Sequence, residues 1–242
     1  MAETITIPGR FSGPPGVGNG GYSCGRFAAL LGGAAEVTLR RPVPLETALE
    51  VRREGSSVRI FDGDQLVAEV SPVNLADIQA PPPVTLEQAV LGASHFPLAE
   101  HPFPTCFVCG PRREKLDGLR IHAYSVPGSA PGNSVVASPW VPSPELADAA
   151  RNMPPEISWA SLDCPTGWAG LADVPGGVGV LGRFAVRIDS PVVADRAHIV
   201  VARATGREGR KLWATGGLYT VAGTLCAASR ATWILVDGER AQ

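Results

Sequence analysis

Residues 13–33 read GPPGVGNGGYSCGRFAALLGG, a loop rich in proline and glycine that leads directly into a stretch rich in alanine and leucine. The apolar second part predicts a helix over residues 22–31. Asn19 and the pair Gly20-Gly21 stand at the entrance to this helix. The first amides of a helix have no partners inside it, and the helix dipole adds positive potential there. The entrance is therefore suited to binding a negatively charged oxygen.

The composition limits the classes of protein to consider. The 242 residues suffice for one large domain or two of ordinary size, and 45% are hydrophobic against 18% charged, as in globular proteins with a substantial core. The formal net charge of -2 provides no basic field for a phosphate backbone, so we expect no nucleic acid partner.

The sequence also carries signals about location. The N-terminal residues MAETITIPGRFSG lack a basic segment followed by an apolar core, so they do not resemble a secretory signal. No stretch approaches the roughly 18 apolar residues of a membrane helix. We expect a soluble, cytoplasmic protein with no membrane partner. The five cysteines are sparse and odd in number, which favours reduced thiols over a disulfide framework.

One order of elements is predicted twice, on either side of a proline-rich connector at residues 79–118. In each half a helix precedes a series of strands. This arrangement predicts an N-terminal unit at residues 1–78 and a C-terminal unit at residues 119–242. The helices are predicted at residues 22–31 and 157–172, and the strands at 35–41, 47–55, 56–73 with a break at Asp62-Gly63, 180–189, 197–206, 211–223 and 224–236.

Short matches between the halves favour a duplication. Of the segments between the three matches, only the hairpin between the second match and the third must differ in length, and hairpin tips tolerate insertion. A chance similarity between two α+β halves is the alternative. The matched pairs are Gly21-Tyr22 with Gly167-Trp168, Pro42 with Pro191, and Leu66-Val67-Ala68 with Leu225-Cys226-Ala227.

A glycine pair that opens a central helix, followed by a meander ending in GGLYTVAGTLCAASRATWILV (residues 216–236), resembles the hotdog fold. In an α+β unit of this kind the antiparallel sheet wraps one apolar helix and buries it. The double arrangement resembles the acyl-CoA thioesterases of the thioesterase superfamily, which carry tandem hotdog units in one chain. The resemblance implies one site between the two helices, an acyl thioester of CoA or a carrier protein as ligand, and assembly into a homodimer.

The helix entrance supplies the first candidate site residues. The amides of Gly21 and Tyr22 are predicted to form an oxyanion hole for the tetrahedral intermediate of thioester hydrolysis. Asn19 would orient the substrate or a water molecule. The alternative is that Asn19 is only an N-cap and that the glycines only permit a tight turn.

The second predicted helix supplies a carboxylate. Asp163 lies among apolar neighbours in SWASLDCPTGWAGLA (residues 158–172), just before Pro165. It is predicted to act as general base or nucleophile, and the resemblance implies an acidic residue at this helix. Thr166 would hold a water molecule beside it, or would simply cap the same turn. The alternative is that Asp163 is an N-cap for the turn at residues 165–167.

The connector contains a possible metal-binding set. His95, His101, Cys106 and Cys109 have the residue types of a tetrahedral zinc site. A single Cys-x-x-Cys is a weaker signal than two pairs, and buried free thiols are the favoured alternative. We therefore assign no metal and no cofactor, and leave the question of zinc at these four residues open.

The sequence predicts an acyl-CoA thioesterase-like hydrolase. A non-catalytic acyl-CoA-binding or lipid-binding protein is the main alternative, and a scaffold that only pairs subunits is another. The histidines lie outside both predicted helices, which disfavours a hydratase, and there is no phosphate-binding loop or Gly-x-Ser-x-Gly elbow. Arg40 with Arg41, or Arg112 with Arg113, are candidates for contacts with CoA phosphates.

Overall fold

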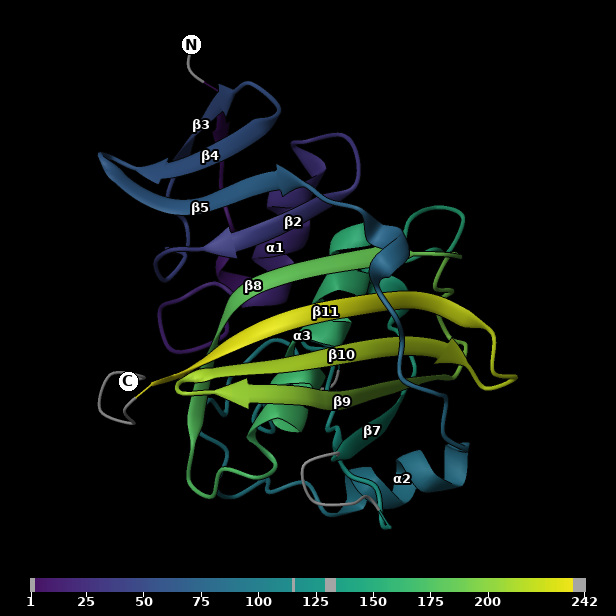
Figure 1. Cartoon of the computed structure of the whole chain (residues 1–242). Helices are drawn as coiled ribbons and strands as arrows, with labels where there is room; N and C mark the ends of the chain where they lie inside the picture. Colours follow the sequence, from purple (N-terminus) through teal and green to yellow (C-terminus); the bar gives the residue numbers. More distant parts are fainter. Residues whose placement is uncertain (1–2, 115, 129–133, 237–242) are drawn as a thin grey trace.

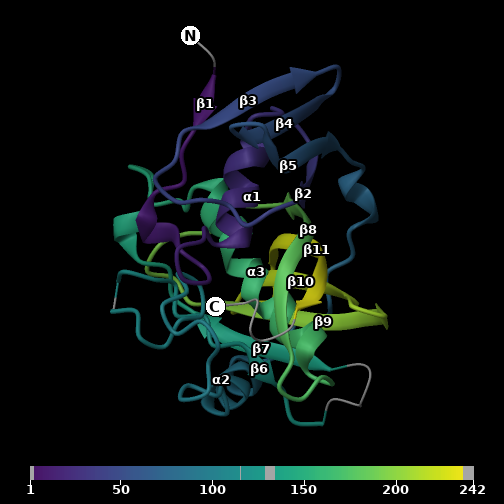
Figure 2. The ribbon, with the colours of Figure 1, turned by 90° about the vertical axis from the view of Figure 1, so that its left-hand side faces the viewer.

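The computed structural model describes residues 3–114, 116–128 and 134–236. Within these ranges an antiparallel sheet of eleven strands curves around two helices, α1 (Gly20–Ala29) and α3 (Pro155–Leu171) (Figure 1). Turned by 90°, the molecule shows both helices on the same side of the sheet (Figure 2). The sheet therefore buries the two apolar helices on one face, as the hotdog resemblance predicted.

The strand order across the sheet is β1-β3-β4-β5-β2-β8-β11-β10-β9-β7-β6. A third helix, α2 (Leu86–Ser94), packs against β7 near one end of the sheet. The strands are β1 (Thr4–Ile5), β2 (Ala35–Leu39), β3 (Leu49–Glu54), β4 (Ser57–Asp62), β5 (Gln65–Pro72), β6 (Tyr124–Ser125), β7 (Val135–Trp140), β8 (Val178–Ile188), β9 (His198–Glu208), β10 (Lys211–Thr220) and β11 (Leu225–Val236).

The two halves of the sheet share one relative strand order. From the outside inward, the first half runs β1-β3-β4-β5-β2 and the second runs β7-β9-β10-β11-β8. In the second half, the additional strand β6 pairs with β7 at the edge of the sheet. The halves join where β2 pairs antiparallel with β8, through Glu36 opposite Ala185 and Thr38 opposite Arg183. This short junction makes one continuous sheet and brings α1 beside α3.

Glycines on one face of α1 let its backbone lie close to α3. A Cβ added at Gly21 would lie 2.4 Å from Asp163 Cβ, and one added at Gly25 would lie 2.7 Å from Glu156 Cα. Both distances are too short for real carbon atoms. Gly21 and Gly25 are one helical turn apart, so they form a continuous small-residue face on which α3 rests.

The sequence predicted the four longer strands of each half closely, but it missed the outer strands β1, β6 and β7 and the helix in the connector. Residues 86–94 form α2, which begins with a capping box: the Thr85 hydroxyl accepts from the Gln88 amide, and the Gln88 side chain accepts from the Thr85 amide. Thr-x-x-Gln is a recognisable helix start, so this signal was present in the sequence. Strand β7 was also missed, since Pro139 weakens its strand pattern.

One anchor of the proposed duplication joins two glycines that lie at different places in their helices. Gly21 lies in the first turn of α1, whereas Gly167 lies toward the end of α3. The two glycines also serve different contacts, because a Cβ at Gly167 would lie 2.8 Å from the Trp233 ring rather than against another helix.

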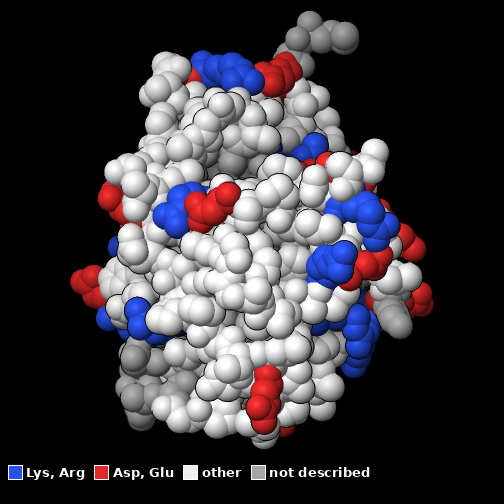
Figure 3. Space-filling view, turned by 90° about the vertical axis from the view of Figure 1, so that its right-hand side faces the viewer, with Lys and Arg blue, Asp and Glu red and all other residues white. Residues whose placement is uncertain are grey.

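Charges of both signs are scattered over the face shown in Figure 3, with wide uncharged areas between them. No helix in the described ranges is long and apolar enough to cross a membrane.

We expect Gly25→Ala to destabilise the protein by about 1–3 kcal/mol, because its methyl group would overlap α3. Alanine is a better helix former than glycine, so helix propensity alone would make the variant more stable. A loss of stability would therefore come from the close approach of α1 and α3. The measurement is the free energy of unfolding by denaturant titration.

The matched control is Gly33→Ala, where an added Cβ meets no atom within 4 Å. We expect that change to stay within about 0.5 kcal/mol of wild type. Equal stability of the two variants would contradict the close contact between α1 and α3.

Candidate functional site

Asn19 and Asp163 are joined in the interior of the protein, although 144 residues separate them in sequence. Asn19 Nδ2 donates to Asp163 Oδ2 at 2.8 Å, and the Gly21 amide donates to the same oxygen at 2.9 Å. Both side chains are 2% exposed. The structure thus brings together three of the predicted site residues, from the entrance to α1 and the middle of α3.

Asn19 both caps α1 and holds Asp163. Its Oδ1 accepts from the Tyr22 amide at 2.9 Å, which is an N-cap contact, while its Nδ2 reaches across to the carboxylate. The two functions that the sequence analysis treated as alternatives are therefore combined in one side chain.

Asp163 is not an N-cap, and that alternative is wrong. Helix α3 begins at Pro155, a residue type favoured in a first helical turn, so Asp163 and Pro165 both lie in the helix interior. A carboxylate at this depth is desolvated rather than placed at a helix end.

The two oxygens of Asp163 have different surroundings. Oδ2 has two donors, whereas the buried Oδ1 has no hydrogen-bond partner among the described residues. The pKa of Asp163 is raised to about 7: burial is the main cause and the nearby Cys106 adds to it, while the hydrogen bonds from the Gly21 amide and Asn19 act against the rise. An unpartnered buried carboxylate oxygen costs stability, which is common at sites kept for chemistry.

Neither amide assigned to the oxyanion hole is free. The Gly21 amide donates to Asp163, and the Tyr22 amide donates to Asn19. The first amide of α1, that of Gly20, has no acceptor within the described ranges, and Gly20 lines the same cavity as Asp163. Gly20 is therefore a candidate donor that the sequence analysis passed over in favour of its neighbours.

Thr166 takes part in packing contacts rather than in contacts with the Asp163 carboxylate. Its hydroxyl donates to the Asp163 main-chain oxygen at 2.6 Å and accepts from Trp233 Nε1 at 2.9 Å. The first bond lies within α3, and the second ties α3 to β11. Nothing in this geometry places a water molecule between Thr166 and the carboxylate.

A cavity of about 390 Å³ adjoins Asp163. Most of its wall is apolar, with Leu39, Val43 and Leu181 among the lining side chains. Arg40 and Arg41 lie at the same cavity; Arg40 is paired with Glu69, while Arg41 has no ion-pair partner within the described ranges. An apolar cavity with a few polar groups is the usual form of a small-molecule site.

In the other candidate pair, Arg112 and Arg113, the side chain of Arg113 is held by contacts within the protein. Arg113 is bonded within the protein, to the main-chain oxygens of Thr105 and Arg10, to Ser12 and to Asp117. It holds the connector against the N-terminal segment and is not available to a phosphate.

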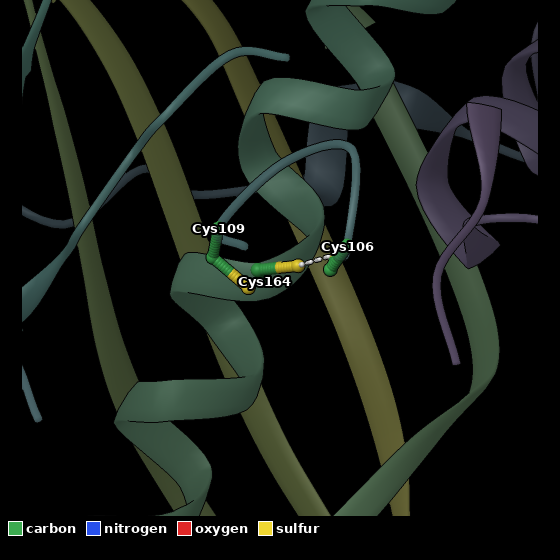
Figure 4. Close-up of side chains that lie close together, drawn as sticks. All are labelled: Cys106, Cys109 and Cys164. Carbon is green, nitrogen blue, oxygen red and sulfur yellow. Dashed lines mark hydrogen bonds between the residues drawn. The ribbon is translucent and has the colours of Figure 1, made fainter. Parts of the chain in front are cut away.

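Three cysteines converge next to this network (Figure 4). Cys106 and Cys109 come from the connector and Cys164 from α3, and their sulfur atoms all lie within 4.8 Å of one another. The Cys106 pKa lies well below its usual value because its sulfur accepts hydrogen bonds from Cys109 and Cys164. His95, which the predicted set joined with His101, Cys106 and Cys109, is instead an exposed residue whose ring donates to the Leu91 main-chain oxygen. Cys164 was missed, although it directly follows Asp163.

No protein-family model and no curated protein matches the sequence. Several solved structures share the fold along nearly the whole chain. The tesB protein of Mycobacterium avium subsp. paratuberculosis aligns over 97% of this chain and 96% of its own, with a TM-score of 0.62 and 12% identity. A protein named as a candidate thioesterase from Novosphingobium aromaticivorans aligns over 97% and 95%, with a TM-score of 0.58 and 16% identity.

A hotdog-fold protein of unknown function from Alicyclobacillus acidocaldarius aligns over 97% of this chain and 92% of its own, with a TM-score of 0.59 and 14% identity. Identities this low show the fold alone. The chain therefore has the hotdog fold, and the resemblance predicted from residues 13–33 and 216–236 is confirmed at that level.

We expect Asp163→Asn to fold and to be at least as stable as wild type in mildly alkaline buffer. The new Oδ1 can accept the bonds from Asn19 and Gly21, while the cost of burying a carboxylate charge disappears. Thermal unfolding of the two proteins in the same buffer tests this expectation.

Asn19→Ala is the contrasting variant. It removes both the cap of α1 and one donor to Asp163, so we expect a loss of about 1–2 kcal/mol. A marked loss of stability in Asp163→Asn, comparable to that of Asn19→Ala, would mean that the ionised carboxylate holds the two helices together.

Proposed function

We propose that this protein hydrolyses an acyl thioester and that the reaction takes place where the entrance to α1 meets α3. The observation that carries the proposal is the Asp163 carboxylate, fixed through one oxygen by Asn19 and Gly21 while its other oxygen has no partner in the described ranges. It adjoins an apolar cavity large enough for an acyl group. The hotdog structures described as thioesterases support this function as an analogy of fold.

Asp163 is proposed to act as the general base. Its Oδ1 takes a proton from a water molecule as the water oxygen attacks the thioester carbonyl carbon. The carbonyl oxygen becomes the oxyanion of a tetrahedral intermediate, which then collapses to the carboxylic acid as the carbon–sulfur bond breaks. The thiolate leaves and receives the proton held by Asp163. Since Asp163 is only 2% exposed, a water molecule reaches Oδ1 more easily than the carbon of a bulky thioester does.

The remaining groups have positioning roles. Asn19 and Gly21 hold Oδ2, which fixes the direction in which Oδ1 points. We assign the oxyanion contact to the Gly20 amide, because the Gly21 and Tyr22 amides donate elsewhere. One such amide is worth about 3–4 kcal/mol when it is aimed at the developing charge.

Acyl-CoA is the ligand we favour. The acyl chain would occupy the apolar wall formed around Leu39, Val43 and Leu181, and Arg41 at the rim would meet a phosphate group of CoA. A carrier-protein thioester carries a single phosphate on the same kind of arm, so the arginine contact also suits that substrate.

We further infer that the chain is a tandem of two hotdog units. Each half contains a central helix and the same relative strand order, and the halves pair edge to edge through β2 and β8. The outer strands β1 and β6 have two residues each, so the described sheet edges offer little for pairing with a second copy. The homodimer thus stays a prediction that needs another surface.

The test is release of free thiol from acyl-CoAs of short, medium and long chain and with an aromatic acyl group. We expect wild type to hydrolyse at least one of them and Asp163→Asn to lose about 10²–10⁴-fold in kcat, because the amide cannot accept the proton. Asp64→Asn, at the exposed turn between β4 and β5, is the matched control and should match wild type.

Two outcomes count against the proposal. Turnover that survives in folded Asp163→Asn would remove Asp163 from the chemistry. Tight binding of acyl-CoA without turnover by wild type would instead support a non-catalytic acyl-CoA-binding protein.

A further inference from the structure

We propose that Cys106, Cys109 and Cys164 bind a zinc ion that fastens the connector to α3 beside the candidate active site. The thiols come from two segments far apart in sequence, the loop at residues 106–109 and α3, and the fold places their three sulfur atoms within 4.8 Å of one another (Figure 4). All three are buried, with exposed fractions of 3%, 3% and 8% respectively. This proposal does not depend on the thioesterase activity.

The spacing of the sulfur atoms fits one tetrahedral metal ion. Two thiolates that each lie about 2.3 Å from a zinc ion at the tetrahedral angle are about 3.8 Å apart. The distance between Cys106 Sγ and Cys164 Sγ is 3.7 Å. Sulfur atoms in a disulfide are about 2.05 Å apart, so this pair is at the separation of co-ligands and not of a bonded pair.

The loop around Cys106 has the backbone of a metal-binding knuckle. The Gly110 amide donates to the Cys106 main-chain oxygen at 2.9 Å, which closes a turn over residues 106–110. A Cβ at Gly110 would lie 2.5 Å from both the nitrogen and the oxygen of Cys106, so only glycine fits this turn. This tight turn brings the sulfur atoms of Cys106 and Cys109 close to that of Cys164, as ligation of one ion requires.

Two neighbouring side chains, His101 and Asn19, donate hydrogen bonds toward the cysteine sulfur atoms. His101 Nδ1 accepts from the Phe103 amide at 3.0 Å, so its Nε2 carries the proton and donates to Cys109 Sγ at 3.2 Å. Asn19 Nδ2 lies 3.8 Å from Cys106 Sγ. We therefore assign His101 a supporting hydrogen bond and not direct ligation, and the fourth ligand to solvent from the adjoining cavity, which all three cysteines line.

Zinc is the metal that this donor set favours. Soft thiolates select zinc, copper(I) or iron–sulfur clusters over hard cations such as magnesium and calcium. A redox role for the Cys106–Cys109 pair is less suited to the structure, because the helix that follows such pairs in thiol oxidoreductases does not follow here. A bound ion would instead join residues 106–109 to α3, next to Asp163 and Asn19.

The first experiment measures metal in the whole chain purified from zinc-supplemented culture. Elemental analysis should find about one zinc per chain. Cys106→Ser, Cys109→Ser and Cys164→Ser should each lose most of it, whereas Cys226→Ser, a buried cysteine outside the cluster, should keep it. Zinc-free wild type that is folded by circular dichroism, with all five thiols reduced and no zinc taken up on titration, would falsify the proposal.

A second measurement does not rely on the serine variants folding. Wild type is stripped with a chelator and titrated with Co²⁺ alone. We expect thiolate-to-cobalt charge-transfer absorption in the near ultraviolet and intense visible bands of tetrahedral cobalt, both abolished by one equivalent of Zn²⁺. Cobalt spectra typical of six oxygen or nitrogen ligands would overturn the site.

His101→Gln tests the assignment of the fourth position. We expect the cobalt–thiolate bands to persist and zinc affinity to fall about 10–100-fold, as for the loss of a hydrogen bond to a ligand. Complete loss of metal binding in the folded variant would show that His101 is itself a ligand and would overturn the assignment to solvent.

Discussion

The candidate site depends on the pair of hydrogen bonds that Asn19 and Gly21 donate to one oxygen of Asp163. These bonds cross the contact between α1 and α3, so they exist only if the two halves of the sheet are joined and the helices lie close together. The joining strands β2 and β8 provide the first condition, and the glycine face of α1 provides the second. A buried carboxylate is expensive unless it is bonded, and here bonding satisfies only one of its oxygens.

This arrangement explains why the entrance to α1 has the sequence Asn-Gly-Gly-Tyr. Asn19 is polar because it has to cap a helix and reach a carboxylate at once, and Gly21 has no side chain because Asp163 Cβ occupies the place where its Cβ would be. The cysteine cluster adds a third segment to the same region. Asn19 lies near both Cys106 and Asp163, so the connector, the entrance to α1 and α3 meet around one amide side chain.

Much of the fold could be predicted from the sequence, since strand alternation and turn residues act locally. The strands at residues 35–73 and 180–236 follow from such patterns, as does the cap at Asn19. Their predicted order as simple meanders was wrong, because β2 pairs with β5 and β8 pairs with β11. Helix α2 was not predicted because the prolines at residues 81–83 are typical of a loop, although a capping box at Thr85 and Gln88 follows them. The hydrogen-bond partners of the Gly21 and Tyr22 amides and the place of Cys164 beside Cys106 depend on how α1 packs against α3. Side-chain contacts between distant segments leave no local pattern, so the structure was needed to find them.

The central claim is that Asp163 activates water instead of attacking the substrate itself. A single turnover of acyl-CoA in H₂¹⁸O, with enzyme in excess, tests it most directly by mass spectrometry of the products and of the peptide containing Asp163. The account predicts that the label enters the released carboxylic acid and that Asp163 remains unlabelled. Label in the Asp163 carboxylate, with none in the acid from the first turnover, would show a covalent anhydride and contradict the account.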